Sequence, residues 1–327
     1  MNLLSVNPRG LTLLTVAALV ITIGSCGVKE KTAKPEDATK VPEGFALIPA
    51  GSFQMGDTLD GEENAPVHDV TLSAFYMAKN LVTWAQWSDV RSWATAHGYR
   101  DFAPGAGKAS NHPVQTVMWL DCVKYCNARS EKEGLTPCYT VSGSVMRTGT
   151  TVPTVNWTAD GYRLPTEAEW EKSARGGLSC KRFPWGDTIS HTNANFWNDG
   201  DESYQPYQTG TSGYDPKYGN GGKPYTSPVG SFAANGYGLY DIVGNVSEWC
   251  WDWYDTDVPY SARSANDPHG AASGSYRVCR GGNWDYRALN CRVGFRDGYF
   301  PDYGKDYIGF RLARSLVRYE PRTWVTL

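Results

Sequence analysis

The chain has 327 residues and a formal net charge of −3; 41% of its residues are hydrophobic and 20% are charged. This balance excludes global disorder, and the weak net charge gives no reason to expect a nucleic-acid partner. Aromatic residues are abundant, with 13 Trp and 20 Tyr beside 35 Gly and 19 Pro. The composition therefore indicates a loop-rich fold held together by many small aromatic clusters.

The first 26 residues have the pattern of an export signal. Arg9 precedes an apolar run over 11–23, and a Gly-Ser-Cys sequence ending at Cys26 follows. This pattern predicts a bacterial lipoprotein signal in which Cys26 is acylated; a plain secretory signal with a coincidental cysteine is the alternative. The apolar run is short for a membrane span. Residues 27–42 are charged and free of aromatic side chains, which favours a flexible tether. We expect an exported protein, anchored by lipid in the bacterial envelope and displayed at the outer membrane or cell surface.

One domain is expected over 43–315, because the composition does not change sharply within this range. Two short strands should flank a Pro/Gly turn within 45–56, and a third strand should cover 67–72 with an extension at 75–77. Beyond Gly177, turn-forming residues dominate, so regular secondary structure should be sparse there. Residues 316–327 form an extension for which the sequence gives no prediction.

Three helices are expected: from Thr83 to about His97, from about Trp119 to Lys132, and from Pro165-Thr166 to about Arg175. Thr166 and Glu169 have the spacing of a capping box. Glu167 and Glu171 lie four residues apart on one face of the third helix, which indicates a structural role and not a catalytic carboxylate cluster. Three acids of an earlier polar loop are expected to be solvated, namely Asp57, Glu62 and Glu63.

Seven cysteines remain after Cys26, and an odd number in an exported protein leaves at least one thiol unpaired or in an intermolecular bond. There is no CxxC sequence, and Cys122 and Cys126 have no His-rich or Cys-rich counterpart that would complete a zinc site. Most of these cysteines are therefore expected to be buried apolar residues.

Five segments, in this order, resemble one known family: FALIPAGSFQMGD (45–57), GYRLPTEAEWEKSARGG (161–177), FPWGD (183–187), NGYGLYDIVGNVSEWCWDWYD (235–255) and RGGNW…IGFR (280–311). Together they look like the formylglycine-generating-enzyme or sulfatase-modifying-factor domain. The resemblance covers 43–314. It implies an α+β fold with sparse regular secondary structure, namely the formylglycine-generating-enzyme type of the C-type lectin fold.

The resemblance also bears on catalysis. Oxidases of this family use two cysteines spaced C-x4-C after the RGG-like segment to bind copper and activate oxygen. Here Tyr286 stands at the first position and Cys291 at the second. A phenol is a poor ligand for Cu(I), which selects thiolates. We therefore expect no copper and no catalysis. The alternative, a formylglycine-generating oxidoreductase acting on a sulfatase cysteine, would need Cys291 together with a second copper ligand.

The C-terminal segment over about 279–311 contains short motifs that we call the frame: RGG with Trp284 (280–284), NCR (290–292), FR (295–296) and IGFR (308–311). The positions between these motifs carry chemically varied residues, rich in Tyr, Asp and Gly. The segment resembles the variable region of proteins diversified by retroelements. In such proteins the adenines of a template copy of the gene are randomised, so that Asn codons become codons for many other residues. Lys305 cannot arise from an Asn codon in this way and would need a different template codon. Two alternatives are an ordinary family member with a drifted loop and a structural subunit of a cell-envelope complex. The candidate ligand-binding positions are Asp285, Tyr286, Ala288, Leu289, Gly294, Asp297, Gly298, Tyr299, Phe300, Asp302, Tyr303, Lys305, Asp306 and Tyr307.

Aromatic and acidic side chains dominate these positions. On the C-terminal face of this fold they would form an aromatic patch with an acidic edge, which is the character of protein recognition sites. Monomeric proteins rarely expose such clusters without a partner. The other interpretation is that the aromatic side chains cover a thin core. We expect a monomer that binds a protein or glycan ligand on another cell or surface.

Calcium is the expected cofactor, in a structural role. Asp241 and Glu248 flank a tight Gly-containing turn and supply the hard oxygen ligands that Ca²⁺ prefers. The family resemblance implies Asp241, Gly244, Val246 and Glu248 as ligands, the middle two through backbone oxygens. It also implies a second, weaker site that begins at Asn195 and Phe196.

Overall fold

The computed structural model describes residues 41–57, 59, 64–201, 203, 205–255 and 266–316. The predicted lipoprotein signal with Cys26 lies outside these residues. So do Glu62, Glu63 and nearly all of the predicted tether and C-terminal extension. Within the described part of the chain, no helix is both long and apolar enough to cross a bilayer.

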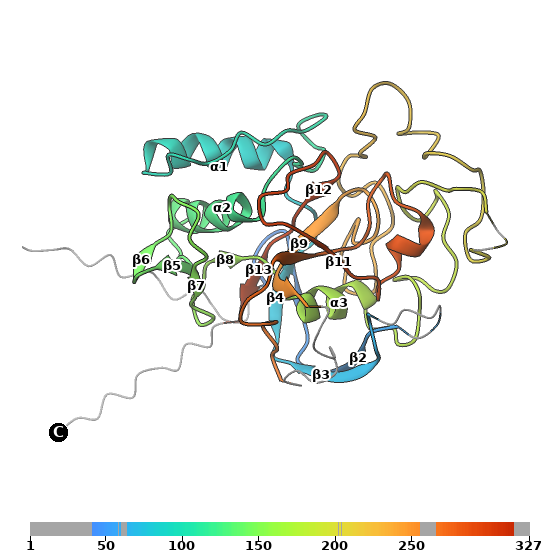
Figure 1. The fold of residues 1–327 in the computed structure, drawn as a ribbon, viewed down its shortest axis with the longest axis horizontal. Helices are drawn as coiled ribbons and strands as arrows, with labels where there is room; N and C mark the ends of the chain where they lie inside the picture. The colour runs from blue at the N-terminus through green and yellow to red at the C-terminus, as the bar shows by residue number, and fades with distance from the viewer. Residues whose placement is uncertain are drawn as a thin grey trace, which may run out of the picture. The chain divides into compact units, whose positions relative to one another are not determined.

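Both ends of the domain meet in one four-stranded sheet (Figure 1). Its order is β1 (Phe45–Ile48), β4 (Phe75–Ala78), β13 (Ala313–Ser315) and β8 (Tyr162–Arg163). β13 pairs antiparallel with β4 and with β8, so the last described strand is an interior strand of this sheet. The other expected N-terminal strands form a separate antiparallel pair, β2 (Gly51–Met55) and β3 (His68–Leu72).

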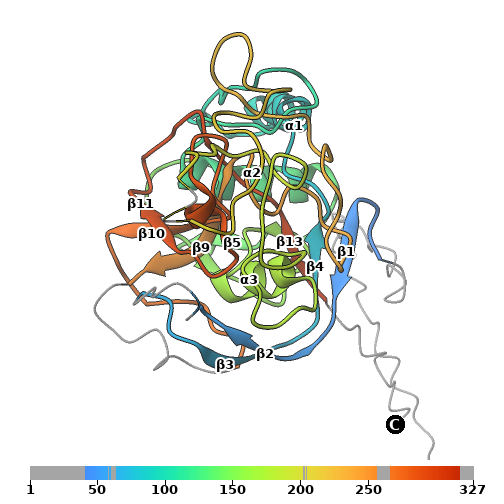
Figure 2. The same ribbon diagram turned by 90° about the vertical axis from the view of Figure 1, so that its right-hand side faces the viewer.

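The three expected helices are confirmed as α1 (Trp84–Ala96), α2 (Trp119–Lys132) and α3 (Glu167–Arg175). Thr166 and Glu169 form the predicted capping box, in which each side chain accepts a hydrogen bond from the backbone N–H of the other. α3 ends at Gly176, whose φ of +58° is the left-handed conformation typical of a helix C-terminus. α1 packs against α2, as both views show (Figure 2).

A second sheet carries the C-terminal segment. Its order is β11 (Asp297–Tyr299), β10 (Tyr276–Arg280), β9 (Ser247–Tyr254) and β12 (Ile308–Gly309). β12 runs parallel to β9, and the other pairs are antiparallel. A small sheet of β6 (Ser144–Val145), β5 (Tyr139–Val141) and β7 (Thr154–Val155) and a 3₁₀ turn, η2 (Ala288–Cys291), complete the fold. As predicted, the described residues between 177 and 246 form no helix and no strand of two or more residues.

The hydrophobic core is divided between the two faces of this second sheet. Successive residues of a strand point to opposite faces, so Trp249 joins one cluster with Trp119 of α2, while Cys250 joins the other with Trp170 of α3. Cys279 lies on strand β10 and is also buried. Six of the seven cysteines in the described residues are buried, Cys180 is exposed, and none forms a disulfide, which confirms that most cysteines serve as apolar core residues.

Candidate ligand-binding face

Four arginines from the frame motifs are buried and pair with carboxylates. Arg311 donates to both oxygens of Glu248 at 2.6 and 2.7 Å. The other pairs are Arg280 with Glu171, Arg296 with Glu167, and Arg292 with Asp57 at 3.5 Å. Removing one member of a buried pair leaves an uncompensated charge, which is strongly destabilising. These four ion pairs therefore hold the C-terminal segment against α3, against β9 and against the loop that contains Asp57.

These pairs refine two expectations about acidic residues. Glu167 and Glu171 have the predicted structural role, and both are buried against arginines of the C-terminal segment. The expectation that Asp57 is solvated is wrong. Asp57 is buried, because Arg292 approaches its carboxylate and the backbone N–H of Leu59 donates to it at 2.7 Å.

The two positions that hold cysteines in the family's oxidases carry no pair of thiolates. The hydroxyl of Tyr286 donates to Asp297 at 2.7 Å and also contacts the hydroxyl of Tyr299. Cys291 is fully buried, and this burial raises the pKa of its thiol to about 12. The thiolate is the nucleophile and the metal ligand. At neutral pH this site therefore presents a hydrogen-bonded phenol and a neutral, enclosed thiol.

Tyr286, Tyr299, Tyr303 and Tyr307 form one tyrosine cluster. Tyr299 stacks on Tyr303 with ring centroids 5.0 Å apart, and Tyr286 stacks on Tyr307 at 6.3 Å. The hydroxyls of Tyr303 and Tyr307 lie 3.1 Å apart, which joins the two stacks. The rings are partly exposed, and three of them, Tyr299, Tyr303 and Tyr307, also pack against the core. The tyrosine cluster is thus both a wall of the core and part of the surface.

Other expected positions extend this surface. Phe300 is 51% exposed and pairs with Tyr276, which is 40% exposed, at a centroid distance of 4.5 Å. Asp302 and Lys305 are exposed, and the ammonium of Lys305 lies 5.1 Å from the ring of Tyr303. Asp306 and Leu289 are partly buried.

The expectation that Ala288 and Gly294 contact a ligand is wrong, because both residues are buried. Ala288 is enclosed in the core cluster on the α3 side of the sheet. Gly294 is buried as well, and a Cβ there would lie 2.4 Å from Cβ of Asp57. Gly298 is partly exposed, yet a Cβ on it would lie 2.7 Å from the ring of Tyr254. Packing therefore restricts the residue at both glycine positions.

Sequence analysis missed two residues of a preceding loop that join this face. The hydroxyl of Tyr214 donates to Asp285 at 2.6 Å, and the ammonium of Lys223 lies 3.5 Å from the same carboxylate. Lys223 also lies over the ring of Trp284 at 5.0 Å. No sequence pattern indicated that this loop lies beside Asp285, 62 residues beyond Lys223 in the sequence.

The predicted calcium residues show one feature that fits a cation. Asp241 has a left-handed backbone (φ +49°), and its Oδ1 is buried without a hydrogen-bond partner. Burial raises the pKa of Asp241 to about 6. Oε2 of Glu248 accepts from Trp170 and Arg311, whereas Oε1 accepts from Arg311 alone. No group of three or more His, Cys, Asp or Glu side chains in the described residues could hold a metal ion. A Ca²⁺ ion here would therefore also need backbone oxygens, as expected for Gly244 and Val246.

The residues of the weaker calcium site already make hydrogen bonds. The backbone carbonyl of Asn195 accepts from the N–H of Asn245 at 2.8 Å, and its side-chain amide donates to the carbonyl of Tyr225. The carbonyl of Phe196 lies 3.1 Å from a ring nitrogen of His191. The calcium assignment at Asn195 and Phe196 remains a prediction.

Comparison with known proteins identifies the family. The family model for the sulfatase-modifying factor enzyme 1-like domain matches residues 30–316. The formylglycine-generating enzyme of Thermomonospora curvata is 31% identical over 325 residues, which cover 84% of this chain and 94% of that protein. The chaperone protein LppX of Paenibacillus barcinonensis is 32% identical over 297 residues, or 85% and 91% of the two chains. The structure of Treponema denticola variable protein 1 is similar, with a TM-score of 0.63 and 30% identity over 83% of this chain and 94% of that one. The chain therefore belongs to the sulfatase-modifying factor family and has its formylglycine-generating-enzyme type of C-type lectin fold.

Proposed function

We propose that this protein binds ligands without catalysing a reaction, and that its C-terminal face is varied by a diversity-generating retroelement. The protein would be displayed on the bacterial surface as a lipid-anchored monomer. Its ligand would be a protein or glycan on another cell or surface. The observation that carries this proposal is the division of 280–311 into buried, ion-paired frame arginines and partly exposed tyrosines between them.

The chemistry of the family's cysteine positions supports a role without catalysis. Tyr286 replaces the first cysteine, and its phenol is already hydrogen-bonded to Asp297. Cys291 is enclosed, and a Cβ on the neighbouring Gly282 would lie 2.6 Å from its sulfur. An oxidase would have to ionise a thiol whose pKa burial has raised to about 12. The surroundings of Cys291 therefore suit a packed core side chain better than a metal ligand.

The exposed chemistry supports recognition. Tyr supplies a large amphipathic contact area with few rotatable bonds, which is why adaptable binding surfaces favour it. Asp285 and Asp302 border the aromatic groups, and Lys223 and Lys305 add two cations. An aromatic centre with a polar rim is the usual anatomy of a protein interface. The similarity to Treponema denticola variable protein 1 over most of both chains is consistent with this role.

The test is to sequence this locus in several isolates. We expect adenine-confined differences at exposed or partly exposed positions such as Asp285, Tyr286 and Tyr303. The codons for Arg280 and Arg296 should be invariant, and a template repeat with a reverse transcriptase gene should lie nearby. An identical 280–311 segment in every isolate, with no template repeat, would contradict diversification. That result would favour a fixed subunit of an envelope complex.

A further inference from the structure

Arg277 of β10 is a buried cation without an acidic partner. It is 1% exposed, and its guanidinium lies between the indoles of Trp119 and Trp253, with Cζ 3.6 and 3.4 Å from the ring centroids. Nη1 donates to the backbone carbonyl of Trp251 at 2.5 Å, whereas Nε and Nη2 have no hydrogen-bond partner. The frame arginines are all paired with carboxylates, so Arg277 requires a separate explanation.

The acid whose charge acts on this guanidinium is Asp252, and it does not neutralise it. Asp252 attracts the charge of Arg277, but no ion pair joins the two residues. One oxygen of Asp252 accepts the backbone N–H of Glu167 at 2.8 Å, at the start of α3 on the other side of the sheet. Burial lowers the pKa of Arg277 to about 9, so the side chain is still a cation at neutral pH. A buried, unpaired charge is unfavourable, and a bound anion would relieve this cost.

Arg277 also lines a surface pocket of about 310 Å³. The indoles of Trp157, Trp251 and Trp253 line the same pocket, together with residues of 152–155 and 269–272. Small-molecule sites typically combine apolar and aromatic walls with a few polar groups that orient the ligand. This pocket has aromatic walls, and the guanidinium is the only unpaired charged group among the described residues that line it.

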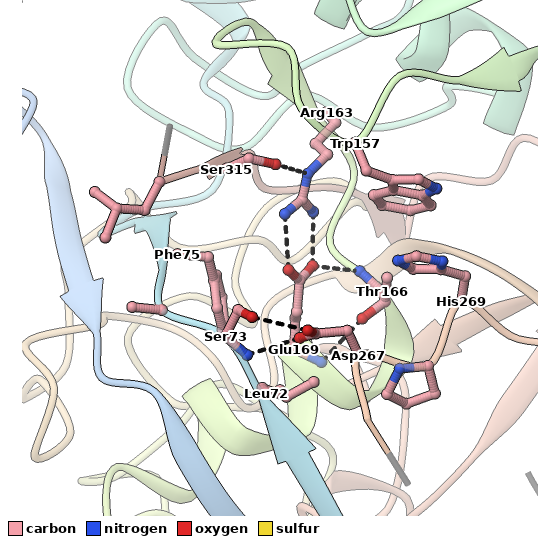
Figure 3. Close-up of a pocket in the computed structure, with 13 residues that line it drawn as sticks. Leu72, Ser73, Phe75, Trp157, Arg163, Thr166, Glu169, Asp267, His269 and Ser315 are labelled. Carbon is pink, nitrogen blue, oxygen red and sulfur yellow. Dashed lines mark hydrogen bonds and ion pairs between the residues drawn. The ribbon is translucent and has the colours of Figure 1, made fainter. Parts of the chain in front are cut away.

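A neighbouring pocket provides a useful contrast. It has a volume of about 250 Å³ and shares Trp157 and His269, whose rings stack at 3.8 Å (Figure 3). Its principal polar groups satisfy one another: Arg163 forms an ion pair with Glu169 at 2.6 Å, and Asp267 accepts from the backbone and hydroxyl of Ser73 (Figure 3). That pocket therefore lacks the unsatisfied cation that marks the pocket at Arg277.

We propose that Arg277 and the surrounding indoles bind a small carboxylate that carries a flat apolar group. Nε–H and one Nη2–H project in parallel from the same edge of a guanidinium and match the two oxygens of a carboxylate. These are the two nitrogens without partners. Both are shielded from solvent, so binding requires a side chain to shift. Trp253 is the partly exposed member of the two stacked indoles, and we assign the shift to it. The site uses none of the candidate variable positions, so it goes beyond the proposed function.

The test uses benzoate as the probe and benzamide as its uncharged isostere, with the full chain studied by calorimetry and tryptophan fluorescence. We expect benzoate to bind and change the fluorescence, and benzamide to bind at least about tenfold more weakly. Arg277→Met should fold, because it replaces a buried charge by an apolar side chain of similar length, and it should lose the benzoate response. Arg277→Lys keeps the charge but lacks the two-donor edge, so it should bind benzoate at least about tenfold more weakly.

Two control variants separate this site from other effects. Arg147→Met removes an exposed arginine and should leave benzoate binding unchanged. Tyr303→Ser alters the tyrosine cluster and should also leave benzoate binding unchanged. A failure of the proposed ligand recognition at the tyrosine cluster would therefore not count against the Arg277 pocket. The proposal is overturned if benzoate gives no response up to about 10 mM. It is also overturned if Arg277→Met responds like the wild type, or if inorganic phosphate binds and benzoate does not.

Discussion

Arg296 donates from Nε and Nη2 to the two carboxylate oxygens of Glu167, at 2.6 and 2.9 Å, and both side chains are 1% exposed. The residues are 129 positions apart in the sequence. This contact ties the segment before β11 to the first residue of α3. The exposed positions between the frame arginines can therefore change while the path of the backbone stays the same, whereas packing restricts the buried ones such as Gly294.

Glu167→Gln should destabilise the protein by about 3–5 kcal/mol, because it leaves the buried guanidinium of Arg296 without its counter-charge. Urea unfolding followed by tryptophan fluorescence would measure the change. Asp302→Asn, at an exposed position of the C-terminal face, is the control and should change stability by less than about 0.5 kcal/mol. Equal effects of the two variants would mean that the ion pair does not anchor the segment.

Gly294→Ala should destabilise the fold by about 1–3 kcal/mol, because its Cβ would clash with Asp57 in a packed interior. Gly222→Ala is a matched control, since a Cβ there meets no atom within 4 Å. Thermal melts of the two variants would measure the difference. A Gly294→Ala protein as stable as the wild type would show that this position is free to vary.

Of the seven thiols from Cys122 to Cys291, only Cys180 should react rapidly with a disulfide reagent in the native protein. Burial raises the pKa of Cys291 to about 12, so this thiol should remain protonated and unreactive up to about pH 9. Cys180→Ser should abolish the fast reaction, and urea should expose the remaining thiols. Rapid native modification of Cys291, identified by peptide mapping, would support the oxidase alternative.

Calcium should raise the melting temperature, because a cation at Asp241 would satisfy a buried oxygen that has no partner. Asp241→Ala should lose this calcium-dependent shift. Asp199→Ala is a suitable control, since Asp199 lies in the loop region but outside the predicted ligand set. If melting in excess Ca²⁺ and in chelator is identical for the wild type, calcium is not a cofactor at Asp241.

The sequence predicted those parts of the fold that depend on local interactions. The start of α3 follows from the capping box of Thr166 and Glu169, which spans four residues, and its end follows from the adjacent Gly176. The pairing of Arg296 with Glu167 was not predictable, because both residue types are usually solvated and the contact joins distant segments. Burial of Asp57 and Gly294 was missed for the same reason: it depends on how two loops pack against each other.

The position of β13 restricts how the C-terminal segment can evolve. Ala313 lies opposite Met77 on one side and Arg163 on the other, so the chain must reach an interior strand in a fixed register. A single inserted residue between β11 and β13 would have to be absorbed in a loop, or it would turn the side chains of β13 to the opposite face. Variation in this segment should therefore exchange residues freely at the surface while conserving their number.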